Sequence, residues 1–113
     1  MVVQVDLSDA EIDRVFRALA DATRRDIVRR TLVGEATVSD LAAEYAMSFA
    51  AVQKHVAVLE GAGLVTKETR GRARLVRADP ATLERARRLL DAYADLWRGR
   101  IDRLDALLAA DDD

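Results

Sequence analysis

One apolar stripe near the carboxyl end limits what this chain can fold into. Asp79 and Pro80 supply a capping acid and a first-turn proline, so the sequence predicts a helix over about 80–109. Its apolar residues recur every three or four positions: Leu83, Ala86, Leu90, Tyr93, Trp97, Ile101, Leu104 and Leu108. At 1.5 Å per residue, this helix would be roughly 45 Å long, too long for a small globule to cover.

We therefore expect a second copy of the chain to cover the stripe, with the first helix contributing as well. That helix is predicted from about Asp9 to Ala20, because Ser8 and Glu11 form a capping box. The predicted dimer interface is Ile12, Phe16, Leu90, Tyr93, Trp97, Ile101, Leu104 and Leu108. An alternative role for Tyr93 and Trp97, which the sequence leaves open, is to line a pocket for a small-molecule effector.

Charge is distributed unevenly along the chain. The net charge is −2, yet residues 46–77 hold six basic and two acidic side chains, a local +4 between two flanks of −3 each. The basic residues are Lys54, Lys67, Arg70, Arg72, Arg74 and Arg77. A basic island inside an acidic chain indicates a site for a polyanion.

Residues 38–62 have the pattern of a helix-turn-helix. After a second helix that begins at Asp21 and ends at Gly34, the segment 37–63 divides into two short helices, one capped by Thr37 and one beginning at Ser48. The later helix turns Val52, Val56 and Leu59 inward, and Gly61 and Gly63 end it. In the second helix, the residues expected to face inward are Ile27, Val28, Thr31 and Leu32.

Residues 64–78 alternate in character around a central Arg-Gly, the pattern of a β-hairpin with its turn at Gly71. Arg70, Arg72 and Arg74 would make its tip basic. The predicted fold is mainly α with one small β-hairpin, in the order α-α-α-α-β-β-α. We expect one domain over 1–110, with an acidic tail at 111–113.

The second helix of a helix-turn-helix reads bases in the DNA major groove. Its expected DNA-binding residues are Ser48, Phe49, Ala50, Gln53, Lys54 and His55, and those of the hairpin are Arg70, Gly71, Arg72 and Arg74. Gln53 and Lys54 are the expected base readers, whereas Ser48 and the hairpin arginines would contact phosphate. Two residues keep open alternatives: Phe49 either packs on a thymine methyl or folds into the turn, and His55 either contacts phosphate or only packs.

These segments together resemble the ArsR family of bacterial transcriptional repressors. The resemblance rests on "LADATRRDIV" at 19–28, "TVSDLAAEYAMSFAAVQKHVAVLEGAGLV" at 37–65 and the Arg-Gly-Arg hairpin, and it covers about 100 residues. It implies a winged helix-turn-helix that dimerises through its terminal helices. In this setting Arg24 and Arg25 would contact the DNA backbone or pair with another part of the protein.

Metal-sensing members of the family carry Cys-Val-Cys where this chain has Thr37, Val38 and Ser39. The chain has no cysteine, and hydroxyls do not replace thiolates for soft ions. Four aspartates on the last helix, Asp91, Asp95, Asp102 and Asp105, are expected to pair with neighbouring arginines rather than to hold a cation. We therefore expect no metal and no cofactor, and the resemblance then points to a metal-free subgroup.

The predicted function is a repressor that binds a palindromic operator in double-stranded DNA as a homodimer and regulates its own gene. An alternative is a winged-helix module for protein interaction or ligand sensing that no longer reads DNA. Nothing resembles a catalytic triad or a phosphate-cradling glycine loop, so an enzyme is not expected. No apolar run reaches the length of a membrane span, and we expect a cytoplasmic protein.

Overall fold

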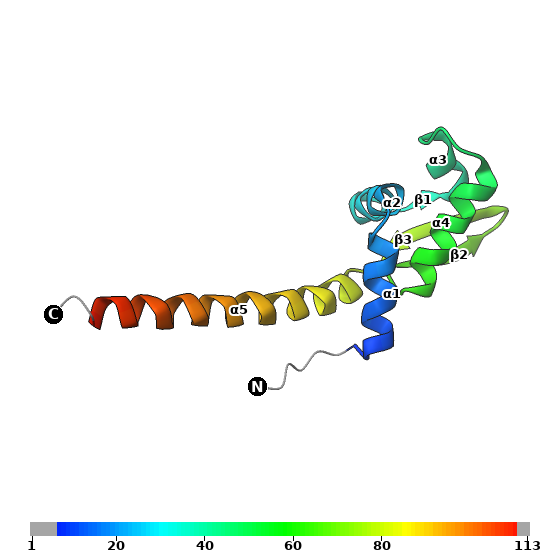
Figure 1. Cartoon of the computed structure of the whole chain (residues 1–113). Coiled ribbons are helices and arrows are strands. Elements are labelled where there is room, and N and C mark those ends of the chain that lie inside the picture. Colours follow the sequence, from blue (N-terminus) through cyan, green and yellow to red (C-terminus); the bar gives the residue numbers. More distant parts are fainter. Residues whose placement is uncertain (1–6, 111–113) are drawn as a thin grey trace.

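A computed structural model describes residues 7–110, and Figure 1 shows a small domain from which one long helix extends. The helices are α1 (Asp9–Leu19), α2 (Ala22–Val33), α3 (Val38–Ala43), α4 (Phe49–Gly61) and α5 (Pro80–Ala110). The strands are β1 (Ala36–Thr37), β2 (Val65–Arg70) and β3 (Ala73–Ala78). The predicted acidic tail at 111–113 lies outside the described residues.

Four of the helices begin where a side chain satisfies the free backbone N–H groups of the first turn. Ser8 and Glu11 form the capping box of α1, and Asp21 accepts from the backbone N–H of Arg24 to cap α2. The remaining caps are Thr37, which forms a second capping box with Asp40, and Ser48. These local signals confirm the predicted starts of the helices.

The sheet has one strand more than the sequence predicted. β1 is only two residues long and pairs antiparallel with β3, so the strand order is β1-β3-β2 and the element order is α-α-β-α-α-β-β-α. Such a strand is too short to show a period of two, which is why the predicted order lacked it. The predicted hairpin is confirmed: β2 and β3 pair from Val65↔Ala78 to Arg70↔Ala73.

Glycine is needed at two turns, one within this hairpin and one just before it. Gly71 occupies the first turn position with a φ of 61°, and no non-glycine residue among those described has a positive φ, which is the pattern of a type II′ turn. Gly63 has a φ of 76° where α4 gives way to β2. A Cβ atom at Gly63 would lie 3.3 Å from the Oγ1 atom of Thr82.

The core fixes the rotation of α4. Val52, Val56 and Leu59 are at most 1% exposed, and they belong to one cluster with residues from every other helix and from the hairpin. This stripe confirms the predicted inward face. One inward residue of α2 was wrong: Leu32 is 49% exposed, because the helix packs through Ile27, Val28 and Thr31 and turns its last residues outward.

The first turns of the long helix α5 are buried on one face, and the rest of the helix is largely exposed. Thr82, Ala86 and Leu89 are buried against the domain, and beyond Leu89 the helix runs into solvent (Figure 1). The described chain therefore measures 73 × 27 × 21 Å. No helix within 7–110 is both long and apolar enough to cross a bilayer.

Hydrogen bonds to the Asp26 carboxylate, called here the Asp26 cluster, tie α2 to the segment that follows α3. Asp26 accepts hydrogen bonds from the hydroxyl of Tyr45 at 2.6 Å and from the Nε atom of Arg30 at 2.7 Å. These hydrogen bonds, with a further one from Arg29, hold the pKa of Asp26 far below its ordinary value. Burial, reinforced by the Asp26 carboxylate, raises the pKa of Tyr45 to about 12. The cluster thereby fixes the end of α3, from which the chain turns into α4.

Replacing Gly63 tests the turn after α4. We expect Gly63→Ala to lower the free energy of unfolding by about 1–2 kcal/mol, because an L-residue is strained at positive φ. Gly61→Ala is the matched control, because a Cβ there meets nothing within 4 Å and alanine favours a helix by up to about 1 kcal/mol. Urea denaturation measures both variants, and equal stability of the two would contradict this account of the turn.

The Asp26 cluster predicts a pH-dependent contribution to stability. Its pKa is depressed in the folded state, so its stabilisation is complete above the ordinary carboxyl pKa and is lost as the pH falls below about 4. Asp26→Asn should cost about 1–2 kcal/mol at pH 7, reduced by the exposure of its arginine partners, and this cost should shrink steadily as the pH falls from about 4 toward the depressed folded-state pKa. Asp13→Asn changes an exposed carboxylate of α1 and serves as the control in denaturant titrations across this range. A cost that did not change with pH would argue against a stabilising carboxylate at position 26.

Candidate nucleic-acid interface

The outward face of α4 carries the residues that the sequence predicted to meet DNA. Ser48, Ala50, Gln53 and Lys54 are exposed, and Phe49 is 46% exposed. Their position follows from the buried stripe of the same helix, because Val52 and Val56 face the core and leave the intervening residues outside. Helix α4 therefore presents an amide, an ammonium group and an aromatic ring side by side.

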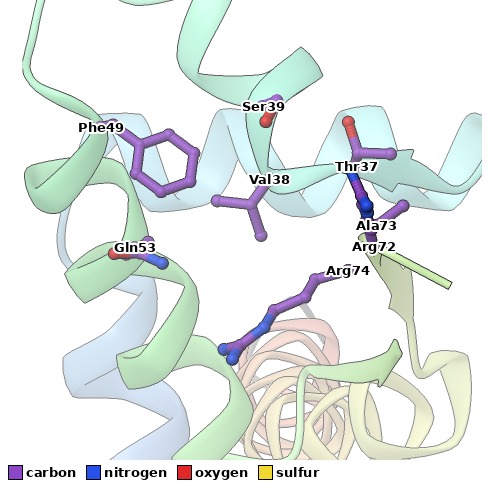
Figure 2. A pocket seen from close by; sticks show the side chains of 8 residues that line it. All are labelled: Thr37, Val38, Ser39, Phe49, Gln53, Arg72, Ala73 and Arg74. Carbon is purple, nitrogen blue, oxygen red and sulfur yellow. The ribbon is translucent and has the colours of Figure 1, made fainter. Parts of the chain in front are cut away.

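A groove of about 480 Å³ lies between this helix and the hairpin. Figure 2 shows Phe49 and Gln53 on α4, Val38 and Ser39 on α3, and Arg74 extending from the hairpin toward α4. Thr37, Arg72 and Ala73 complete the lining. The groove thus joins an apolar corner to hydroxyl groups and guanidinium groups, and it brings the two predicted sets of DNA-binding residues together.

The basic residues of the hairpin divide into paired and unpaired groups. Arg77 donates to Glu35 at 2.6 Å, and this bond holds the pKa of Glu35 below its ordinary value. Arg70 lies 3.5 Å from carboxylate oxygens of both Glu35 and Glu68. Lys67 lies 3.9 Å from Glu60. Three of the six basic residues between 46 and 77 therefore already lie close to carboxylates of the protein.

The unpaired cations are the ones nearest the groove. Within residues 7–110, the side chains of Lys54, Arg72 and Arg74 make no hydrogen bond or ion pair. Arg72 and Arg74 line the groove, and Lys54 follows Gln53 on α4. An unpaired guanidinium group is suited to bind phosphate, because it presents a fixed fork of donors.

His55 lies at the edge of the exposed face of α4, next to the core, and its side chain is half-buried. Its Nδ1 atom is 3.4 Å from the Nη1 atom of Arg24 and 4.0 Å from the Asp21 carboxylate. The backbone N–H of Arg24 donates to that carboxylate, and this bond, helped by the nearby His55 and Arg24 side chains, holds the pKa of Asp21 below its ordinary value. The predicted half-burial of His55 is confirmed, and a phosphate contact by its other ring nitrogen stays a prediction.

Arg24 and Arg25 have a role that the sequence reading did not identify. Arg24 donates to the carbonyls of Ala18 at 2.7 Å and Arg17 at 3.0 Å, and Arg25 donates to the carbonyl of Leu19 at 2.8 Å. These carbonyls lie in the last turn of α1, where the helix dipole also favours a cation. The paired arginines just after a helix end were the available signal, because they can bend back onto its last turn.

The described residues include no cluster suited to a metal ion. No three His, Cys, Asp or Glu side chains within 7–110 are arranged to hold one. The hydroxyl of Thr37 accepts from the backbone N–H of Asp40, whereas Ser39 lines the groove. On α5, Asp91 and Asp95 pair with Arg87 and Arg98.

The predicted dimer residues lie apart from the groove, on a second exposed surface. On α5 the stripe from Leu90 to Leu108 is open to solvent: Tyr93 is 55% exposed and Trp97 58%. Leu96 and Leu107, which the predicted stripe omitted, are exposed beside it. On α1, Phe16 is 38% exposed and Ile12 is half-buried. The contacts that would join these residues to a second chain stay a prediction.

Known proteins resemble this chain in both sequence and fold. Residues 19–68 match a family described as a helix-turn-helix domain. The HTH-type transcriptional regulator Rv2034 of Mycobacterium tuberculosis is 41% identical over 81 residues, which make up 72% of this chain and 76% of that protein.

Solved structures give the same result. An ArsR-like transcriptional regulator from Rhodococcus sp. RHA1 is 32% identical, with a TM-score of 0.76 over 87% of this chain and 92% of that one. The homodimeric winged helix-turn-helix DNA-binding domain Mb0332 of Mycobacterium bovis is 25% identical, with a TM-score of 0.63 over 84% of this chain and 91% of that one. These relatives are regulators and not enzymes. The chain belongs to the ArsR family of winged helix-turn-helix transcriptional regulators.

Proposed function

We propose that this protein is a homodimeric repressor that binds a palindromic operator, including one upstream of its own gene. The observation that carries the proposal is the groove between α4 and the hairpin, which places Gln53 beside the unpaired Arg72 and Arg74. A residue that can pair with a base edge and cations that can bind phosphate thus share one concave surface.

In the proposed complex, α4 enters the major groove with Gln53 and Lys54 toward the bases. Gln pairs with the N6 and N7 atoms of adenine, and Lys with the acceptors of guanine. One DNA strand then lies along the groove of the protein, where Arg72 and Arg74 bind its phosphates. Ser48 would add a phosphate contact at the start of α4, where backbone N–H groups point outward.

The exposed stripe of α5 supports a dimer. A run of large apolar side chains open to solvent over residues 90–108 forms a continuous patch of the kind that marks a protein interface. Pairing through α5 and α1 would relate two α4 helices by a twofold axis, so the operator would be palindromic with half-sites one helical turn, about 34–36 Å, apart. A dimer that covers promoter DNA in this way represses by occupying it.

Two substitutions separate base reading from backbone binding. Gln53→Ala should reduce preference for the operator while leaving affinity for random duplex DNA nearly unchanged. Arg72→Ala should weaken binding to every sequence and reduce the slope of log affinity against log salt by about 1. Fluorescence anisotropy with the upstream DNA and with a random duplex, over a range of salt, measures both effects.

The outcomes of this experiment separate the possible functions. If wild-type protein bound the upstream DNA no better than random duplex, specific autoregulation would be refuted and the module would act through another partner. If Gln53→Ala changed the salt slope and Arg72→Ala changed the sequence preference, the two roles would have to be exchanged.

A charge in the exposed stripe tests the dimer. We expect Trp97→Arg to shift the protein from dimer to monomer in sedimentation at micromolar concentration, because a guanidinium group would be buried without a partner. Asp102→Asn, a change away from the stripe on the same helix, should leave the dimer intact. A monomeric wild-type protein under these conditions would refute the proposed interface.

A further inference from the structure

We propose that Phe49 reads the 5-methyl group of a thymine within two base pairs of the adenine that Gln53 contacts. The inference rests on the proposed DNA-binding function and names a feature of the operator half-site. It makes Phe49 a specificity-determining residue beside Gln53 and Lys54.

The first observation is the exposure of the ring. Phe49 is 46% exposed and lies outside the core cluster, although burying an aromatic ring stabilises a protein. It therefore does not fold fully into the turn, one of the two roles the sequence left open. In Figure 2 the ring lines the groove next to Val38, on the same side as Gln53.

The second observation is the spacing along α4. Phe49 and Gln53 are four residues apart, so their Cβ atoms lie about 5–6 Å from each other on one face of the helix. Successive base pairs are about 3.4 Å apart. The two side chains consequently reach base pairs that are one or two steps from each other.

The chemistry of the DNA major groove also favours thymine. A phenyl ring has no hydrogen-bonding group, and among the four bases only thymine presents an apolar group there, its 5-methyl. The cations and hydroxyls of the same groove, at Arg72, Arg74 and Ser39, suit the phosphate strand instead. The apolar corner formed by Phe49 and Val38 is thus left to the bases.

The test first selects the preferred site from random-sequence duplexes bound by the full-length protein. Each thymine of the selected site is then replaced by uracil, which pairs identically but lacks the methyl group. For wild-type protein, one thymine per half-site should be sensitive, with a loss of about fourfold in affinity per half-site, since a buried methylene contributes about 0.8 kcal/mol.

Variants assign the effect to Phe49. Phe49→Ala should bind the thymine and uracil duplexes equally, whereas Phe49→Leu, which keeps an apolar side chain, should retain part of the difference. Val58→Ala removes an apolar residue of similar exposure, 44%, elsewhere on α4 and should show the full wild-type difference. Circular dichroism and thermal unfolding check that all three variants are folded.

The possible failures can be told apart. Selection of no preferred sequence would refute the proposed sequence-specific function and this inference with it. A selected site at which no thymine is sensitive to methyl removal, or at which the sensitivity persists in Phe49→Ala, would overturn the role of Phe49 while leaving the proposed function intact.

Discussion

The rest of the molecule depends on how three side chains of α4 pack. Val52, Val56 and Leu59 are almost completely buried, and their contacts fix the rotation of the helix about its axis. A helix positioned in this way turns Phe49, Gln53 and Lys54 toward solvent, and this is the face proposed to bind DNA. The caps, the Asp26 cluster and the glycine after α4 all maintain this one orientation.

Electrostatics adds a second level of organisation. Of the six cations between residues 46 and 77, Lys67, Arg70 and Arg77 face carboxylates of the protein, chiefly Glu35. The ion pairs of Arg70 and Arg77 with Glu35 connect the residue before β1 to the hairpin. Of the remaining cations, Arg72 and Arg74 line the groove and Lys54 lies on α4, so a chain with net charge −2 still presents unpaired positive side chains at the face proposed to bind a polyanion.

Local signals in the sequence predicted much of this structure. Capping residues, apolar periodicity and the Arg-Gly turn located all five helices and the hairpin, because each acts over only three or four neighbouring positions. The misses share a different cause: they depend on contacts between residues that are distant in the sequence.

Particular residues show what such contacts decide. β1 exists only because β3 pairs with it, and Arg70 and Arg77 find their partner in Glu35, which lies 35 or more positions earlier. Leu32 follows the inward spacing of α2 but ends exposed, since no other element covers the end of that helix. For the candidate site, the sequence predicted which side chains of α4 would be exposed, whereas the unpaired state of Arg72 and Arg74 required the fold.

The helix α5 runs unbroken from the domain to its far end. Its buried first turns follow β3 directly, the backbone N–H of Asp79 before the helix donates to the carbonyl of Leu64 before β2, and the far turns of the helix carry the exposed stripe. A single helix without a hinge transmits a tilt at one end to the other. In the proposed dimer, changes of side-chain size near Trp97 would therefore alter the distance between the two faces proposed to bind DNA while every residue on those faces stays the same.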